Sequence, residues 1–412
     1  MKNLVEHFFR HEYGHLVTVL TQKVGFSHIQ EVEDAVQDAL LIALESWTQK
    51  GVPDNPHAWL YKVAHNNVLG VLRQKNRRIE ILEQHQASIE TIEHDDLEKA
   101  LTNEFKDGIL NWLFISCHPS IVVESQLIFA LKTLCGFSIK EIAIRLFTSE
   151  ANVYKRYSRA RNYLRNNAAD VAKLKIIDHS VRLSAVNKVI YLIFTEGYLS
   201  SHMQQTIRKE MCDDAIRLCT ILIENKVGKN PETHALLALM HLHRARLSAR
   251  INDSNELLLL EDQDRKLWNQ NEIQQGLYWL SKAANGNQFS RYHAEAGIAI
   301  EHCLSPSFEH TRWDKIVSCY QLLEKTTGSA LHQLNKVVAL AQWQGAQAGL
   351  TELNKQNIPQ WLLDSYQYHA VQSDLNRRCG NRKKAKSFAE KAIQLAPTPA
   401  IKKSLNSRLE YE

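Results

Sequence analysis

Apolar residues recur at helical spacing along most of the 412-residue chain, and three such segments occupy its N-terminal part. These segments lie at residues 4–24, 31–47 and 57–78. The middle segment is the clearest, because its apolar positions repeat every three or four residues while the opposite face is rich in carboxylates. Pro56 follows the loop 51–55 and suits the first position of the third helix. The pattern predicts a bundle of three helices over residues 1–78.

A second helical module is predicted at residues 108–168, and it contains the spacing of a helix-turn-helix. The first helix of this motif is expected to bury four side chains, namely Ile139, Ile142, Ala143 and Leu146. Ser149 can cap a second helix over residues 150–164, from which Val153 packs inward.

The remaining residues, 169–412, form a series of amphipathic segments separated by short breaks, as in stacked helical hairpins. Helices are expected at residues 184–194, 213–224, 232–250, 271–284, 313–324, 330–343 and 381–395. No strict repeat of about 34 residues runs through the region, so it is predicted to be a degenerate tetratricopeptide-like domain. The chain has only 15 glycines and 8 prolines, whereas β-rich folds need these residues for turns. Together the patterns predict an all-α fold.

Charge changes abruptly after the first module. Residues 59–78 carry five cations and no acid, whereas residues 79–107 carry nine acids and two lysines. A strongly acidic segment with few apolar side chains is typical of a solvated linker. The net charge of +5 for the whole chain hides this contrast.

The second helix of the helix-turn-helix is strongly basic and carries no acid beyond its first residue. A recognition helix lies in the major groove with its N-terminal residues against base edges. We therefore assign Asn152, Lys155 and Arg156 to base or phosphate contact, and Arg159 and Arg161 mainly to phosphates. The DNA-binding residues predicted for this module are Ser149, Asn152, Tyr154, Lys155, Arg156, Arg159 and Arg161. The alternative interpretation is a basic helix that only faces solvent.

Catalytic, metal-binding and cofactor-binding sites are not expected in this chain. The seven cysteines include no Cys-x-x-Cys pair, which fits reduced thiols in a cytoplasm. Cys117 has no cysteine or histidine at metal-ligand spacing and is expected in the core. The acidic cluster 261–264 is expected to cap a helix or to pair with Arg265 and nearby cations. No apolar run approaches the roughly 20 residues of a membrane span, so a cytoplasmic protein is expected.

Both ends of the N-terminal half resemble extracytoplasmic-function sigma factors of bacterial RNA polymerase. Residues 31–40, EVEDAVQDAL, resemble the acidic second helix of that family, which docks on the coiled coil of the largest polymerase subunit. Residues 55–66, NPHAWLYKVAHN, resemble the region that melts and reads the minus-ten promoter element. The helix-turn-helix then occupies the place of the module that reads the minus-thirty-five element. The resemblance also implies a second interpretation of the acidic linker, namely that it threads the polymerase channels.

The resemblance implies two further sets of functional residues. The polymerase-binding residues would be Asp34, Gln37, Asp38 and Leu41. The DNA-binding residues of the first module would be Tyr61, Asn66, Arg73, Lys75, Arg77 and Arg78. Aromatic faces stabilise unpaired bases by stacking, but Trp59 is expected in the core of the bundle. For Tyr61, both core packing and base stacking remain open.

Residues 113–119, 191–198 and 260–268 resemble one sigma subgroup that carries a C-terminal tetratricopeptide-like extension in place of a separate anti-sigma protein. Family members usually have an acidic and then a basic residue where this chain has Gly70 and Val71, and Asn67 replaces a common arginine. A glycine within a helix costs about 1 kcal/mol relative to alanine. The third helix is therefore expected to end or bend early.

The predicted domains are sigma region two at residues 1–78, the acidic linker at 79–107, sigma region four at 108–168 and the tetratricopeptide-like regulatory domain at 169–412. The predicted function is a sigma factor whose partners are core RNA polymerase and promoter DNA. The C-terminal domain leaves room for a protein or small-molecule partner. Two alternatives stay open: a helix-turn-helix regulator with a helical sensor domain that acts without polymerase, and a tetratricopeptide scaffold that has lost promoter function.

Overall fold

The computed structural model of the chain describes residues 2–75, 108–146, 148–168, 176–198, 208–252, 258–286, 288–397 and 399–409. All regular elements in these residues are α-helices or short 3-10 helices, which confirms the all-α prediction. The chain divides into two compact units. The first unit comprises Met1–Glu196 and Thr220–Gly228, and the second comprises Gly197–Cys219 and Lys229–Glu412.

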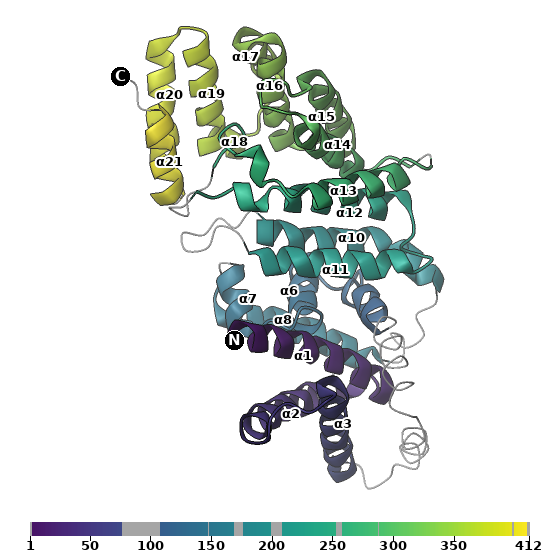
Figure 1. Cartoon of the computed structure of the whole chain (residues 1–412). Helices are drawn as coiled ribbons and strands as arrows, with labels where there is room; N and C mark the ends of the chain where they lie inside the picture. Colours follow the sequence, from purple (N-terminus) through teal and green to yellow (C-terminus); the bar gives the residue numbers. More distant parts are fainter. Residues whose placement is uncertain are drawn as a thin grey trace. The chain divides into compact units, whose positions relative to one another are not determined.

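The first unit begins with the predicted bundle of three helices (Figure 1). They are α1 (Lys2–Val24), α2 (Ile29–Lys50) and α3 (Pro56–Lys75), and the 3-10 helix η1 (Phe26–His28) lies between α1 and α2. Gly25 and Gly51 stand at the breaks with φ of +91° and +84°, which glycine adopts without strain. The core side chains include Leu20, Val36 and Leu60, each completely buried.

The expectation that the third helix ends early at Gly70 is wrong, because α3 continues through it to Lys75. Gly70 is exposed, and a Cβ added there would meet nothing within 4 Å. Its neighbours Val68, Leu69 and Leu72 are all buried. The burial of these three apolar side chains outweighs the cost of about 1 kcal/mol for a glycine in a helix.

The second module of the first unit begins with a helix over residues 108–116. It continues with α6 (Val123–Thr133), α7 (Ile139–Arg145) and α8 (Glu150–Asn166). Its core is aromatic: the Phe129 ring stacks on Trp112 at 5.5 Å and on Tyr157 of α8 at 5.6 Å between centroids. This core fixes α8 by its buried side, so the polar side of α8 faces outward.

The two modules of the first unit pack directly against each other. At Gly136, with φ of +71°, a Cβ would lie 2.0 Å from the backbone oxygen of Arg10 in α1. At Gly14 of α1, a Cβ would lie 2.9 Å from the backbone oxygen of Thr133. The guanidinium of Arg10 lies over the ring of Phe137, 4.4 Å from its centroid. Two glycines therefore allow α1 to touch the turn between α6 and α7.

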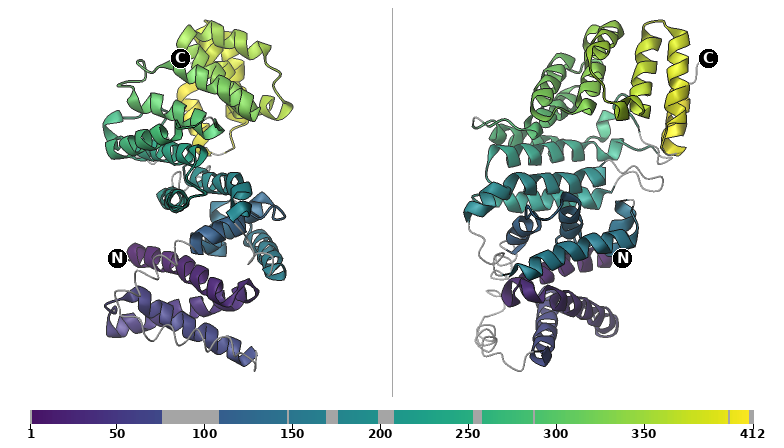
Figure 2. Two further views of the ribbon diagram at one scale, coloured as in Figure 1. Left: turned by 90° about the vertical axis from the view of Figure 1, so that its right-hand side faces the viewer. Right: turned by 180° about the vertical axis from the view of Figure 1, so that it is seen from behind.

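The chain continues with α10 (Ile176–Tyr198) and α11 (Lys209–Glu224), both of which contribute residues to the two units. The remaining helices of the second unit are α12 (Pro231–Ala245), η2 (Leu247–Ala249), η3 (Arg265–Leu267), α13 (Gln270–Ala283), α14 (Arg291–Leu304), α15 (Trp313–Thr327), α16 (Ala330–Gln344), α17 (Ala346–Lys355), α18 (Gln360–Leu363), α19 (Tyr366–Arg378), α20 (Arg382–Gln394) and α21 (Pro399–Leu409). Sequential helices lie side by side as pairs, clearest for α12 with α13 and for α19 with α20 (Figure 2).

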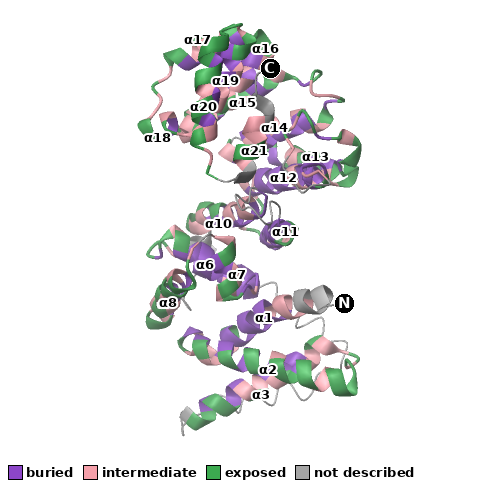
Figure 3. Ribbon diagram, turned by 90° about the vertical axis from the view of Figure 1, so that its left-hand side faces the viewer, coloured by how far each residue is buried: buried purple, intermediate pink, exposed green. Residues whose placement is uncertain are grey.

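Small residues let these paired helices approach closely. A Cβ at Gly276 of α13 would lie 2.6 Å from side-chain atoms of Leu242 in α12. In the last pair, Ala385, Ala389 and Ala392 form the buried side of α20. The helix α12 is largely enclosed, and it is drawn as buried along most of its length in Figure 3.

The predicted helix over residues 232–250 is too long, since α12 ends at Ala245. The amide of Ala249 bonds to the carbonyl of Arg246, three residues back, so the chain continues as the 3-10 helix η2. Among the described helices, none is long and apolar enough to cross a membrane.

Candidate nucleic-acid interface

Both helices of the helix-turn-helix have side-chain caps, of which the sequence predicts only the one at Ser149. Ser138 caps α7 with a complete capping box, in which its Oγ accepts from the Glu141 amide at 3.1 Å and its amide donates to the Glu141 carboxylate at 2.7 Å. Ser149 begins α8, and its Oγ accepts from the Asn152 amide at 3.2 Å. Ile142, Ala143 and Val153 are buried as predicted, whereas Ile139 and Leu146 are only half-buried.

The outward face of α8 carries most of its predicted DNA-binding residues. Tyr154 is 58% exposed, and Lys155 and Arg159 are exposed as well. Arg156 donates to Asn152 Oδ1 at 3.3 Å and lies 3.8 Å from the carboxylate of Glu124. Asn152 also donates to Thr148 at 2.7 Å. These hydrogen bonds hold the side chains of Asn152 and Arg156 in place at the N-terminal turn of α8.

Arg161 lies on a different side of α8 and contacts the first module instead of solvent. Its Nη1 donates to Glu33 Oε2 at 3.3 Å, and the Tyr157 hydroxyl donates to Glu33 Oε1. From α1, Tyr13 also donates to Glu33 Oε1, at 3.1 Å. Glu33 is only 4% exposed, so this buried carboxylate joins α1, α2 and α8.

Burial and the nearby Glu33 charge raise the pKa of both Tyr13 and Tyr157 well above the usual tyrosine value. Both hydroxyls therefore stay protonated and act as donors. Lys132 Nζ donates to the Tyr13 hydroxyl at 2.6 Å and brings α6 into the same network. The sequence pattern did not single out Glu33, since its partners lie 20, 124 and 128 positions away.

The predicted polymerase-binding residues form a separate face of α2. Asp34, Gln37 and Asp38 are exposed, and Leu41 is 58% exposed. Leu44 extends the same face and is 47% exposed. Burial and the neighbouring Glu33 raise the pKa of Asp34. Positions three, four and seven apart share one side of a helix, so α2 presents carboxylates around an exposed apolar stripe.

The predicted DNA-binding residues of α3 differ in their exposure. Tyr61 is buried, 6% exposed, and its ring stacks on His65 with centroids 5.7 Å apart. Asn66 and Arg73 are exposed. Lys75 ends α3, but its side chain lies outside the described residues, as do Arg77, Arg78 and the acidic linker at 79–107.

Trp59 is half-buried, and its ring lies 5.6 Å from that of Trp47 in α2. It therefore packs at the edge of the bundle and not in the buried core, where the sequence predicts it. Tyr61 has the more enclosed ring of the two. The Nζ of Lys23 in α1 lies 5.4 Å from the centroid of the Tyr61 ring.

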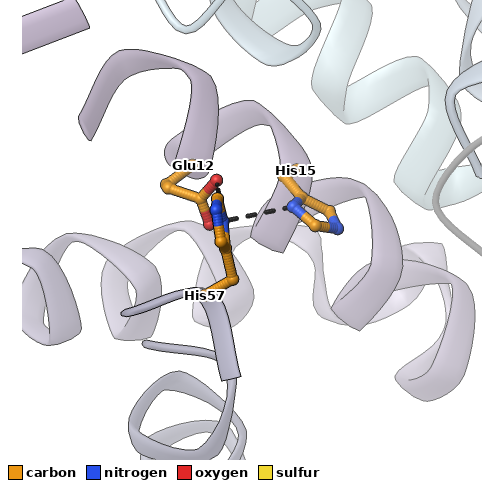
Figure 4. Close-up of side chains that lie close together, drawn as sticks. All are labelled: Glu12, His15 and His57. Carbon is orange, nitrogen blue, oxygen red and sulfur yellow. Dashed lines mark hydrogen bonds and ion pairs between the residues drawn. The ribbon is translucent and has the colours of Figure 1, made fainter. Parts of the chain in front are cut away.

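A second buried carboxylate joins α1 to α3. Glu12 is 4% exposed, and its Oε1 lies 2.7 Å from Nδ1 of His57, while its Oε2 lies 3.7 Å from Nδ1 of His15 (Figure 4). Burial alone would raise the pKa of Glu12, but the two histidines outweigh it and lower the pKa to about 2. The three ligand atoms lie within 4.8 Å of one another, a donor set that a divalent metal also accepts. The histidine–carboxylate contacts account for the cluster as a polar connection between α1 and α3.

Two other groups behave as the sequence predicts. Cys117 is buried at 1% exposure, and burial raises the pKa of its thiol to about 12, as in an unreactive core cysteine. In the acidic cluster 261–264, Asp264 caps η3 by accepting from the Lys266 amide at 2.9 Å.

Comparison with known proteins places these elements in families. The family Sigma-70 region 2 matches residues 8–78, and Sigma-70, region 4 matches residues 123–164. A family of unknown function (DUF6596) matches residues 182–284. An uncharacterized protein of Rhizobium meliloti (strain 1021) is 29% identical over 406 residues, covering 96% of this chain and 94% of that protein. No solved structure gives a significant match.

A region 2 domain followed by a region 4 domain defines a sigma-70-type factor, a non-enzymatic protein that directs transcription initiation through RNA polymerase and promoter DNA. This chain carries both domains and adds a C-terminal helical domain that begins with DUF6596.

Proposed function

We propose that the chain is a sigma factor of the extracytoplasmic-function type. It binds core RNA polymerase through the exposed face of α2 formed by Asp34, Gln37, Asp38 and Leu41. It then directs initiation at promoters that α3 and α8 contact at two separate elements.

The observation that carries this proposal is the opposite character of two exposed helix faces in one unit. The α2 face combines carboxylates with Leu41, and the α8 face carries Lys155, Arg156 and Arg159. A carboxylate face suits a protein surface rich in cations, whereas a basic recognition helix suits the phosphates and base edges of DNA. A regulator that acts without polymerase has no use for the first face.

The roles of the basic residues follow from their exposure. Arg156 is close enough to the start of α8 to reach a base edge, and Arg159 faces solvent one turn later, in reach of phosphates. Arg161 donates to Glu33, so it reaches a phosphate only after this contact breaks. In α3, Asn66 and Arg73 are exposed, and they are proposed to contact the minus-ten element.

The C-terminal domain is proposed to be tetratricopeptide-like and to tune the activity of the sigma domains in the same chain. Its support is the succession of paired helices with small residues at their contacts, such as Gly276 and Ala389. A cytoplasmic location follows from the proposed partners, polymerase and DNA.

Transcription with purified components tests the proposal. Promoters mapped after overproduction of the chain are transcribed with core polymerase, with and without the full-length protein. The proposal expects initiation only when both are present, and a gel shift with promoter DNA that requires core polymerase. Tight and specific binding of the chain alone, without any initiation, would favour the helix-turn-helix regulator instead.

A further inference from the structure

The segment that joins α12 to α13 folds back onto the end of α12 and brings several arginines together. The amide of Asn269 donates to the carbonyl of Ala245 at 2.9 Å, and the amide of Leu258 donates to the carbonyl of Arg250 at 2.8 Å. These bonds fix the two described ends of the segment. Between them lie Gln263, Arg265 and Trp268, from the 260–268 motif whose role the sigma functions leave unexplained.

Two arginines share the indole of Trp268. The guanidinium carbon of Arg246 lies 5.2 Å from the ring centroid, and that of Arg265 lies 4.6 Å from it. Arg246 is 8% exposed, and both its Nε and Nη2 donate to Oε1 of Gln263 at 3.3 Å. A neutral amide oxygen is thus the hydrogen-bond acceptor for this buried charge.

The third arginine, Arg250, is also 8% exposed. It donates to the backbone carbonyl of Tyr198, and its guanidinium carbon lies 3.8 Å from the centroid of the Tyr198 ring. Arg265 likewise donates to backbone carbonyls, those of His302 at 2.7 Å and Ser305 at 3.0 Å. All three guanidinium groups therefore bond to neutral oxygens.

Within the part of the chain that the structure describes, no carboxylate lies within 4.0 Å of Arg246, Arg250 or Arg265. Elsewhere in the same unit, arginine has carboxylate partners: Arg244 lies 2.8 Å from both Asp213 and Glu272. Burying a charge without a counter-ion is costly, and several like charges together add mutual repulsion. Among the described residues, the three arginines therefore form a region of positive charge that no carboxylate contacts directly, and only the more distant Glu309 attracts Arg265 electrostatically.

The same region holds polar groups without partners. Nη2 of Arg265 and Nε1 of Trp268 are buried donors with no hydrogen-bond acceptor among the described residues, and Trp268 is only 3% exposed. His302 is 8% exposed, and burial together with the arginines lowers its pKa to about 3. The nearby imidazole is neutral, so the positive charge belongs to the arginines.

We infer that Arg246, Arg250 and Arg265 form a binding site for a small anion that carries phosphoryl groups. Such a ligand supplies the negative charge and the acceptors that the cluster lacks. A phosphate dianion suits several guanidinium groups better than a single carboxylate does, because it offers more oxygens and more charge. The site belongs to the DUF6596 segment, so it does not depend on the proposed promoter or polymerase contacts.

Calorimetry on the full-length protein tests the inference, with pyrophosphate as the probe and chloride at matched ionic strength as the control. The expected result is saturable binding of one pyrophosphate per chain and a higher melting temperature that chloride does not reproduce. Inorganic phosphate and ATP, titrated in separate arms, distinguish a free phosphate from a nucleotide as the preferred source. Equal effects of pyrophosphate and chloride would overturn the inference.

A matched pair of variants at Gln263 separates charge from packing. Gln263→Glu places a carboxylate against Arg246 and is expected to weaken pyrophosphate binding by about tenfold or more, a change of about 1.4 kcal/mol. Gln263→Met has a similar size but leaves the arginine charge uncompensated, and it is expected to keep binding within about threefold of the unaltered protein. Equal affinities for the two variants would contradict the inference.

A second pair covers the case in which variants at the buried Gln263 fail to fold. Arg265→Gln removes one of the charges at the half-buried edge of the cluster and is expected to abolish the pyrophosphate-dependent rise in melting temperature. Arg312→Gln is the control, since Arg312 is 61% exposed and pairs with Asp314 at 2.8 Å. If Arg265→Gln and Arg312→Gln both respond as the unaltered protein does, the three arginines are not the site.

Discussion

The carboxylate of Glu33 in α2 accepts a hydrogen bond from Nη1 of Arg161 in α8 at 3.3 Å. One residue later, Asp34 points to solvent on the face proposed for polymerase. The helix α2 therefore carries a buried carboxylate on one side and exposed carboxylates on the adjacent side. Glu33 holds the recognition helix against the first module, and the exposed carboxylates remain available to a partner.

The buried pairing predicts a large effect of Glu33→Gln on the first unit. The substitution keeps the shape but leaves Arg161 next to a neutral group, and breaking a buried ion pair costs about 3–5 kcal/mol. Calorimetric unfolding and hydrogen exchange of α8 amides measure the change. Glu45→Gln, at an exposed position of α2, is the control and is expected to stay within about 0.5 kcal/mol. Equal stabilities of the two variants would contradict the role of Glu33.

Substitution by alanine is expected to have opposite effects on the stability of the first unit at Gly136 and at Gly70. Gly136→Ala requires a side chain at φ of +71° and 2.0 Å from the backbone oxygen of Arg10, so it should destabilise the first unit by well over 1 kcal/mol. Gly70→Ala, in open space on α3, should stabilise it by about 0.4–1 kcal/mol. Denaturant midpoints measure both. Loss of stability in both variants would show that Gly70 also has a tertiary role.

The sequence predicted well those features that depend on neighbouring residues. The cap at Ser149 follows from its residue type at the start of α8, and the buried side of α8 and the exposed side of α2 follow from helical spacing. The exact end of α12 did not follow, because the amphipathic pattern continues to Arg250 although the backbone tightens at Arg246.

Contacts between distant segments could not be predicted. In the sequence, Glu33 is indistinguishable from the other acidic residues of α2. It is buried and bonded to Tyr157 and Arg161 only because α8 packs against α2. His57 is likewise 45 positions from Glu12. The close approach of Gly136 to Arg10 depends on how the two modules of the first unit pack, so the residues around Gly136 in the sequence could not predict it.

Protonation of Glu12 at low pH is expected to destabilise the first module. Its pKa is lowered to about 2 in the folded protein, so its contribution is fully present above the unfolded value near 4.5 and is lost as the pH falls toward 2. The contribution is on the order of 3 kcal/mol. Glu12→Gln should flatten the pH dependence of unfolding between about pH 4.5 and 2. An unchanged pH profile in this variant would assign the acid sensitivity to other groups.

Substitutions of Arg156 and Arg159 in α8 are predicted to have different effects on DNA binding. Arg156→Ala should cost about 1–3 kcal/mol and change the preferred promoter sequence, because its place near the start of α8 suits a base edge. Arg159→Ala should weaken binding to all promoters alike and lower the slope of log affinity against log salt by about one. Binding to a promoter panel at several salt concentrations, with core polymerase present, separates the two. Identical effects of both variants would refute this division.

The exposed acidic face of α2 is proposed to bind core RNA polymerase. Co-elution of the purified full-length chain with core polymerase measures this binding, comparing Asp38→Lys with Asp54→Lys, a charge reversal in the loop after α2. The unaltered chain and Asp54→Lys are expected to co-elute with polymerase, whereas Asp38→Lys is expected not to co-elute although it remains folded. Failure of the unaltered chain to co-elute, or full retention by Asp38→Lys, would refute polymerase binding through this face of α2.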